Sequence, residues 1–360
     1  MKAFVTGGTG FIGQHIVRKL IERGDDVYAL ARSERSAAIV RGLGATAVNG
    51  DITDTASMRD DMVGSDVVFH IAAWYKVGSS DWEKAESINV GGTRKVLRLA
   101  NELGVPKIVY TSTVGVFGNT NGQLVDETYE QGAPFLTEYE RTKWLAHYKV
   151  ALPLIEKGAP IIIVMPGGVY GPGDTSILAE MMRLFYRGLP AVPGPETTLT
   201  FAHVEDVAEG HLLAAEKGRV GESYILAGPS IPLGEMFDFW SHLTGKPSPT
   251  IRIPSQLLRP FAPLMGAIGN VISLPSAFSQ EATASLGATY MARSDKAREQ
   301  LGWQTRPLQT GMLETFDWIA ETESKQPSIF QGNEKKVAAV AFGTAVILFL
   351  AWLLSNQRKK

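Results

Sequence analysis

The sequence predicts an α/β fold built on a doubly wound parallel sheet. Two observations support this prediction: short runs rich in Val, Ile and Phe alternate with amphipathic segments through the first half of the chain, and the chain opens on a strand that leads straight into a glycine turn. Apolar strands separated by helices are typical of βαβ units, whose parallel strands are covered on both faces. Residues 1–165 are therefore predicted to form the core of the sheet.

Six strands are predicted in this half of the chain. They are the runs KAFVTG, DVYALA, ATAVNG, DVVFHIA, KIVYTST and PIIIVMPG, at 2–7, 26–31, 45–50, 66–72, 107–113 and 160–167. The segments between them include IGQHIVRKLIERG at 12–24 and ESINVGGTRKVLRLANELG at 86–104, whose apolar residues recur at helical spacing. Each of these segments is long enough to cross from one parallel strand to the next.

After Pro166 the chain changes to loops rich in Gly and Pro and to shorter elements. We expect a smaller lobe, drawn mainly from 166–300, that packs over the carboxyl edge of the sheet, where a substrate would bind. The apolar stretch at 257–275 is interrupted by Arg259, Pro260 and Pro263. It is predicted to be a buried or lid helix, and the alternative is a surface that rests on a membrane interface.

The C-terminal region predicts a membrane anchor. Residues 337–354, VAAVAFGTAVILFLAWLL, contain no charge, and a helix of this length spans about 27 Å at ~1.5 Å per residue. Charged residues flank the segment at 334–336 and in the basic tail at 355–360. We expect a catalytic domain at 1–322, a polar linker at 323–336 and a single anchor at 337–354. A buried or self-associating helix is the alternative.

Composition excludes several classes of function. The net charge of −2 provides no basic field for nucleic acid, so nucleic acid is not an expected partner. Without cysteine the chain has no disulfide, thiol nucleophile or thiolate zinc site. None of the six histidines forms an HExxH-type pair, and no metal site is predicted.

The turn after the first strand predicts a dinucleotide site. VTGGTGFIGQHIV places Gly7, Gly10 and Gly13 at a junction between a strand and a helix. Gly7 and Gly10 let the backbone approach a pyrophosphate without a Cβ, and Gly13 lets the helix pack on the strand. The N-terminus of the helix favours the anion.

The end of the second strand favours NADP. A carboxylate at that place would bind the ribose 2′-hydroxyl of NAD, but the chain has Ala31, followed by Arg32 and Arg35. A guanidinium pairs well with a 2′-phosphate, so NADP is the expected cofactor. The alternative is that Arg32 is a solvated loop charge and NAD also binds. A reduced nicotinamide cofactor and the absence of a signal peptide favour a catalytic domain that faces the cytoplasm.

The stretch TEYERTK at 137–143 contains Tyr139 and Lys143 four residues apart, on one face of a helix. The spacing alone is weak evidence, because such pairs occur by chance. Its context is specific: TGxxGxxG at 6–13, NVGGT at 89–93, Thr113, PGGVYGPGD at 166–174, HVEDVA at 203–208 and KAREQLGW at 296–303. With these motifs in this order, the chain resembles the extended short-chain dehydrogenase/reductase family, also grouped as NAD-dependent epimerase/dehydratases, over nearly its whole length to about residue 320.

The resemblance implies a Rossmann sheet and roles for individual residues. Tyr139 exchanges a proton with the substrate oxygen, Thr113 hydrogen-bonds that oxygen, Lys143 holds the nicotinamide ribose, and Asn89 supports a proton relay. A nearby ammonium is expected to lower the pKa of Tyr139. The hydroxyl of the adjacent Ser112 could replace that of Thr113. The residues expected to contact the cofactor are Gly7, Gly10, Phe11, Ile12, Gly13, Arg32, Asp51, Ile52, Ala72, Ala73, Tyr139, Lys143 and Pro166.

The sequence narrows the reaction within this family. Sugar-nucleotide dehydratases resemble one another in an Asp–Glu pair after the catalytic Thr, where this chain has Val114 and Gly115. Nucleotide-sugar epimerases often carry an Arg and an Asn where Met165 and Gly168 stand. The region around 69–97 resembles the dihydroflavonol reductase, 3β-hydroxysteroid dehydrogenase and hopanoid-associated branch.

We therefore expect an NADP-dependent oxidoreductase that interconverts a ketone and a secondary alcohol on a small hydrophobic substrate, steroid-, isoprenoid- or flavonoid-like. The alternatives are a nucleotide-sugar epimerase with tightly bound NAD and a non-catalytic NADPH-binding protein of membrane assembly. Four aromatic residues are candidates for an apolar substrate pocket or for the core: Trp74, Tyr75, Phe117 and Phe135. The resemblance also implies a homodimer through the helix that carries Tyr139.

Overall fold

The computed structural model describes residues 1–75, 81–269 and 276–325. The predicted anchor at 337–354, the basic tail and most of the linker lie outside these residues. Within the described ranges no helix is long and apolar enough to cross a membrane. The chain divides into two units, Met1–Phe316 and Asp317–Lys360, and the fold described below is that of the first.

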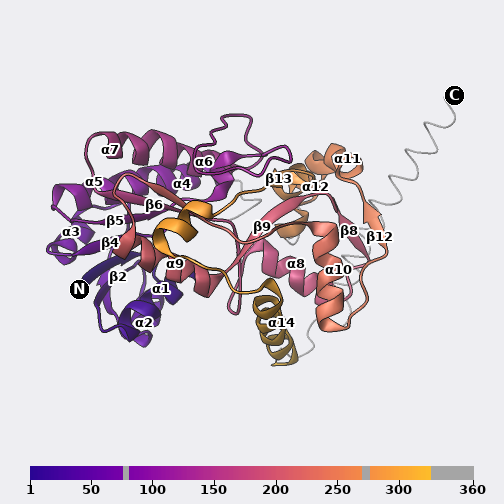
Figure 1. Cartoon of the computed structure of the whole chain (residues 1–360), viewed down its shortest axis with the longest axis horizontal. Helices are drawn as coiled ribbons and strands as arrows, with labels where there is room; N and C mark the ends of the chain where they lie inside the picture. The colour runs from indigo at the N-terminus through magenta and orange to yellow at the C-terminus, as the bar shows by residue number, and fades with distance from the viewer. Residues whose placement is uncertain (76–80, 270–275, 326–360) are drawn as a thin grey trace. The chain divides into compact units, whose positions relative to one another are not determined.

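A seven-stranded parallel sheet forms the centre of the first unit (Figure 1). The strand order is β10-β6-β5-β4-β1-β2-β3, and every neighbouring pair is parallel. The strands are β1 Lys2–Thr6, β2 Asp26–Ala31, β3 Thr46–Asn49, β4 Val67–His70, β5 Ile108–Thr111, β6 Ile161–Pro166 and β10 Ser223–Leu226. The six strands predicted from the sequence are confirmed. The order reverses beside β1, so the carboxyl ends of β1 and β4 border a crevice in which such folds bind ligands.

Helices cover both faces of this sheet, and each face has its own apolar core. On one face lie α3 (Ala56–Met62), α5 (Thr93–Glu102) and α6 (Glu138–Ala146). On the other lie α1 (Phe11–Glu22), α2 (Glu34–Gly42) and α9 (Val204–Lys217). The remaining helical segments of this part are α4 Trp82–Glu86, η1 Ser87–Gly92, η2 Val114–Phe117, η3 His147–Ala151, α7 Leu152–Glu156 and η6 Ala297–Leu301. Two segments of this first core, η1 and η3, are π-helical turns, which are frequent at functional sites.

The smaller lobe contains two further sheets, one of four strands and one of two strands. The first consists of β7 Gly168–Tyr170, β9 Thr198–His203, β11 Ser230–Pro232 and β13 Thr289–Tyr290; the second pairs β8 Ala191–Pro193 with β12 Ile251–Ile253. Its helices are α8 Ile177–Tyr186, α10 Leu233–Thr244, α11 Ser255–Leu258, η4 Arg259–Phe261, α12 Ala262–Gly269, η5 Ser276–Phe278, α13 Gln280–Ser285 and α14 Leu308–Lys325. A cluster of aromatic rings fills the lobe: Phe185, Phe237, Trp240 and Phe316.

Three features differ from the prediction. The chain returns from the lobe to the central sheet through α9 and β10, so the sheet does not end at residue 165. The apolar stretch at 257–269 is not one helix but three short segments, because Pro260 and Pro263 interrupt it, and Leu264 of α12 is 39% exposed rather than buried. Residues 323–325, predicted as linker, belong to the last turn of α14.

Candidate active site

The glycine turn after β1 packs backbone against backbone. Gly7 has a φ of +78°, and a Cβ there would lie 2.5 Å from the main-chain nitrogen of Ala72. A Cβ on Gly13 would overlap the carbonyl oxygen of Gly7, so α1 can approach β1 only with glycine at this position. The loop after β4 thus requires glycine at position 7, because it packs directly against that residue. This steric requirement comes in addition to the predicted approach of a pyrophosphate.

The N-terminus of α1 has the properties of an anion site. Gly10 is the N-cap, with an extended backbone, and it has no side chain that could cap the first turn. The first N–H groups of a helix have no partner within the helix, and here they belong to Phe11, Ile12 and Gly13. These N–H groups and the helix dipole together favour a phosphate group at this place.

A recess of about 440 Å³ lies at the carboxyl ends of β2 and β3. Its lining residues are Ala31, Arg32, Ser33, Glu34, Asn49, Gly50, Asp51, Asp54 and Ser57. Arg32 is exposed and is the single cationic side chain of the lining, which Arg35 does not join. Although burial opposes it, hydrogen bonds from the N–H and hydroxyl of Thr53 hold the pKa of Asp51 below its usual value.

The other predicted cofactor residues follow strands at the same edge of the sheet. Ile52 follows β3, where it packs beneath η1, since a Cβ on Gly92 would lie 2.5 Å from its Cδ1 atom. Ala72 and Ala73 follow β4, and Pro166 ends β6. Their contacts with a cofactor stay predictions.

The hydroxyl of Thr113 lies near the phenol of Tyr139, close enough to act on its pKa. Tyr139 lies in the first turn of α6, and Thr113 follows β5, where its hydroxyl also accepts a hydrogen bond of 3.1 Å from the Gly115 N–H. The adjacent Ser112 is turned away, because its hydroxyl bonds the Nδ1 atom of His147 at 2.9 Å. Thr113 is therefore the hydroxyl residue that meets Tyr139.

Burial dominates the acidity of Tyr139. It raises the pKa of the phenol to about 12, while the nearby hydroxyl of Thr113 acts in the opposite direction. Lys143 was expected to lower the pKa of Tyr139. That expectation was wrong, because burial raises this pKa and Lys143 does not offset the rise. The phenol is therefore protonated at neutral pH and can donate its proton.

Lys143 lies beneath this pair with its ammonium group buried. Its Nζ atom donates to the main-chain oxygen of Thr111 at 2.7 Å and lies 3.4 Å from the hydroxyl of Tyr110. The side chain is 3% exposed, and burial lowers the pKa of Lys143 to about 7. No carboxylate of the described residues contacts it. The charged form of the lysine is therefore buried without a counter-ion, which is energetically unfavourable.

Neutral histidines surround the lysine. Burial, and to a smaller extent the charge of Lys143, lower the pKa of His70 and of His147 to about 3. The ring of His70 stacks on Tyr110 at 5.6 Å, and its two nitrogens bond the hydroxyls of Thr6 and Thr93 at 2.7 and 2.9 Å. Sequence reasoning missed Tyr110 and His70; their signal is a polar group inside an otherwise apolar strand.

Asn89, on the π-helical turn η1, uses its whole amide. Its Oδ1 atom accepts from the Trp74 N–H at 2.6 Å, and its Nδ2 atom donates to the Trp74 carbonyl at 3.1 Å and to the Thr142 hydroxyl at 2.9 Å. The side chain is 1% exposed. These contacts fix the loop after β4 to α6; the predicted relay through Asn89 stays a prediction.

One of the four aromatic candidates contacts Tyr139. The ring of Tyr75 meets Tyr139 edge to face at 4.8 Å and is 48% exposed. Phe117 is 1% exposed within the core, which is the second of its two predicted alternatives. Phe135 packs on Trp144 at 5.6 Å, and the indole of Trp74 lies 4.7 Å from the Nζ atom of Lys84.

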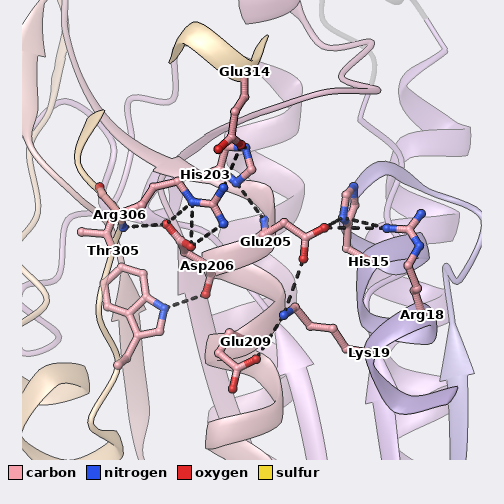
Figure 2. Close-up of polar contacts among 11 residues, drawn as sticks. His15, Arg18, Lys19, His203, Glu205, Asp206, Glu209, Thr305, Arg306 and Glu314 are labelled. Carbon is pink, nitrogen blue, oxygen red and sulfur yellow. Dashed lines mark hydrogen bonds and ion pairs between the residues drawn. The ribbon is translucent and has the colours of Figure 1, made fainter. Parts of the chain in front are cut away.

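The HVEDVA motif at 203–208 is structural (Figure 2). Asp206 accepts hydrogen bonds from the N–H and the guanidinium of Arg306 at 2.8 and 3.0 Å. Glu205 lies 2.5 Å from His15 and 3.5 Å from Lys19, both on α1. The motif thereby joins α9 to α1 and to the segment after η6.

Comparison with known proteins agrees with this geometry. Residues 3–227 match the NAD dependent epimerase/dehydratase family. Sterol demethylase protein B of Methylococcus capsulatus is 30% identical over 89% of this chain and 99% of its own length. A 4-hydroxy-2-methyl-3-oxo-4-farnesyl-3,4-dihydroquinoline-1-oxide ketoreductase of Stigmatella aurantiaca is 31% identical over 85% and 92%.

Among solved structures, that of gox2253 superimposes with a TM-score of 0.78 at 32% identity, covering 90% of this chain and 99% of the other. The structure of DesIV, a dTDP-glucose 4,6-dehydratase from Streptomyces venezuelae with NAD bound, has a TM-score of 0.72 at 22% identity over 90% and 98%, a likeness of fold. The chain belongs to the NAD dependent epimerase/dehydratase family, the extended short-chain dehydrogenase/reductases, and is an NAD(P)-dependent oxidoreductase.

Proposed function

We propose that this protein is an NADP-dependent oxidoreductase that interconverts a ketone and a secondary alcohol on a hydrophobic substrate. The observation that carries the proposal is the protonated phenol of Tyr139, which lies near the Thr113 hydroxyl and on the same helix as the buried Lys143. A phenol with a pKa of about 12 is a proton donor at neutral pH, which suits reduction of a ketone.

The residues present fit a dinucleotide. The backbone cradle of Gly7 and Gly13, the uncapped N-terminus of α1 and the recess at Arg32 follow one another along the carboxyl edge of the sheet. The first N–H groups of α1 would hold the pyrophosphate, and the recess would hold the adenosine ribose. When bound, the nicotinamide supplies or accepts the hydride.

The chain's own residues then divide the remaining work. Tyr139 gives its proton to the carbonyl oxygen as negative charge develops there, and Thr113 donates a hydrogen bond to the same oxygen. Lys143, already directed to the carboxyl end of β5 by the Thr111 carbonyl, would hold the ribose hydroxyls of the cofactor, and its positive charge stabilises the phenolate that remains. In the alcohol-oxidising direction the same groups act in reverse.

Three observations support reduction of a ketone on a hydrophobic substrate. The residues after Thr113 are Val114 and Gly115 in η2, which provide no acid–base pair for elimination of water. Tyr75 places an exposed aromatic edge against Tyr139. Two relatives carry names that refer to a sterol and to a farnesylated ketone. We therefore place the substrate among steroid-, isoprenoid- or flavonoid-like ketones.

Turnover with a defined panel tests the proposal. Purified full-length protein is mixed with NADPH and a 3-ketosteroid, a farnesyl-bearing ketone, a dihydroflavonol or UDP-glucose, and loss of NADPH absorbance is followed. We expect consumption of NADPH with a lipophilic ketone. Conversion of UDP-glucose without net consumption of cofactor would show a nucleotide-sugar epimerase instead, and binding of NADPH without any turnover would support a non-catalytic protein.

Replacement of Arg32 by alanine is expected to raise the KM for NADPH about 10-fold and to leave the KM for NADH unchanged. A hydrogen bond to a charged group is worth roughly 1.5–3 kcal/mol, and Arg32 is the cation of the recess. Steady-state kinetics with each cofactor measure the effect, with Arg35→Ala as the matched control outside the recess. An equal rise for both cofactors would show that Arg32 does not recognise the 2′-phosphate.

We also propose that residues 337–354 anchor the protein in a membrane, with the catalytic domain in the cytoplasm. The support is the uncharged run of 18 residues between charged flanks. Flotation of vesicles is expected to carry the full chain upward and to leave a chain ending at residue 336 at the bottom of the gradient. Equal flotation of both chains would overturn the anchor. A homodimer through α6 remains a prediction from the family resemblance.

A further inference from the structure

The smaller lobe holds the first turn of the catalytic helix α6 at two points, one on each side of Tyr139. The Tyr290 hydroxyl of β13 donates a hydrogen bond of 2.5 Å to the Oε1 atom of Glu140. The N–H of Glu138 donates one of 2.9 Å to the Oε1 atom of Glu281 on α13. The two neighbours of Tyr139 in sequence are thus both bonded to the lobe.

Glu140 is a buried carboxylate whose two oxygens have separate tasks. Its Oε2 atom accepts from the Leu136 N–H at 2.9 Å, while its own N–H donates to the hydroxyl of the N-cap residue Thr137 at 3.1 Å. This is the reciprocal arrangement of a capping box, displaced by one residue, and it requires only one oxygen. The other oxygen is used by Tyr290, and the side chain is 4% exposed.

Tyr290 is itself fixed to the lobe. Its strand pairs in parallel with β9, where Tyr290 lies opposite Leu199. The Thr200 hydroxyl donates to the main-chain oxygen of Tyr290 at 2.5 Å. The phenol is therefore held by the lobe sheet and not by α6, and its hydrogen bond joins that sheet to α6.

On its other side Glu140 lies against the turn that presents Thr113. A Cβ on Gly115 would lie 4.0 Å from the Cγ atom of Glu140 and 3.4 Å from the Thr113 hydroxyl. The stem of Glu140 and the hydroxyl of Thr113 thus border the same small space. A shift of the Glu140 side chain would therefore displace both Tyr139, its neighbour in the chain, and Thr113.

We infer that Glu140 and Tyr290 are positioning residues, which set the catalytic Tyr139–Thr113 pair in register with the substrate lobe. The inference rests on the proposed function. A substrate bound by the lobe then meets the proton donor at a fixed place, since the hydrogen bond of Tyr290 ties the lobe sheet to the catalytic turn. Misplacement of catalytic groups by about 1 Å costs up to roughly 100-fold in rate.

Tyr290→Phe removes the hydroxyl and keeps the ring. With NADPH and the ketone of highest turnover in the panel above, we expect kcat to fall about 10-fold or more while the KM for NADPH stays unchanged. Tyr224→Phe is the matched control: it removes another phenol that links distant segments, bonded to the Arg219 N–H and to Gln300, outside the catalytic turn. The melting temperatures of the two variants should be similar. A kcat for Tyr290→Phe equal to that of Tyr224→Phe would overturn the inference.

The two Glu140 variants provide an independent test. In Glu140→Gln the amide oxygen can accept from the Leu136 N–H and the amide nitrogen can donate to Tyr290, so kcat should stay within about threefold of the wild type. Glu140→Ala should lose kcat as Tyr290→Phe does. Equal kcat values for the Gln and Ala variants would overturn the inference.

Tyr139→Phe, measured in parallel, distinguishes failure of the positioning role from failure of the proposed function. If it loses turnover while Tyr290→Phe keeps it, the positioning role fails and the proposed function stands. If Tyr139→Phe keeps turnover, both fail.

Discussion

Replacement of Tyr139 by phenylalanine is expected to lower kcat for ketone reduction roughly 10²- to 10⁴-fold, the usual contribution of a positioned acid. The ring stays, so its packing against Tyr75 at 4.8 Å is kept, but the proton donor is lost. Binding of NADPH should change little, because the cradle at Gly7 and Gly13 does not involve the phenol. Stopped-flow measurement of NADPH oxidation and a fluorescence titration of NADPH give the two quantities.

Tyr75→Phe is the matched control for this prediction. It removes a phenolic hydroxyl from the other ring of the same aromatic pair, which is half exposed and not hydrogen-bonded to Thr113. We expect its kcat to remain within a few-fold of the wild type. A Tyr139→Phe variant as active as Tyr75→Phe would remove Tyr139 from the mechanism.

Replacement of Lys143 by methionine is expected to abolish turnover and, at the same time, to stabilise the fold by about 2 kcal/mol at pH 6. Burial lowers the pKa of Lys143 from 10.5 to about 7, and each unit of difference between unfolded and folded chains is worth about 1.4 kcal/mol. Hydrogen bonds of the ammonium, such as that to the Thr111 carbonyl, offset part of this cost.

The pH dependence of this difference has a defined sign. Between about pH 7 and 10.5 the unfolded chain keeps the proton of Lys143 and the folded chain does not, so the stability of the wild type rises with pH in that window. The advantage of Lys143→Met should therefore be full below pH 7 and vanish as the pH approaches 10.5. Urea unfolding at pH 6, 8 and 10 measures it, with the exposed Lys149→Met as control. A difference that is constant with pH would contradict the buried charge.

The parts of the fold that depend on local sequence were predictable. Each strand of the first half carries an apolar run, and the glycine turn has a steric reason at Gly7 and Gly13. Alternation along β5 also separated Thr113 from Ser112, and the structure places Thr113 on the Tyr139 side. These features depend on neighbours in the chain or on a regular period, which a single sequence contains.

Features that depend on distant pairing were not predictable. Strand β10 is four residues long and lies between segments of the lobe in the chain, so no periodic signal assigned it to the central sheet. The acidity of Tyr139 follows from how deeply three-dimensional packing buries it, which outweighs the nearby lysine. The bond between Glu140 and Tyr290 joins residues 150 positions apart.

The amide of Asn89 holds both main-chain groups of Trp74, while the next side chain, Tyr75, extends into solvent beside the catalytic phenol. A residue whose main chain is held by hydrogen bonds, Trp74, is thus followed directly by one whose side chain is half exposed, Tyr75. Under the proposed function, an exchange of Tyr75 for another side chain would change the surface offered to a substrate and leave Tyr139 and its supporting contacts in place.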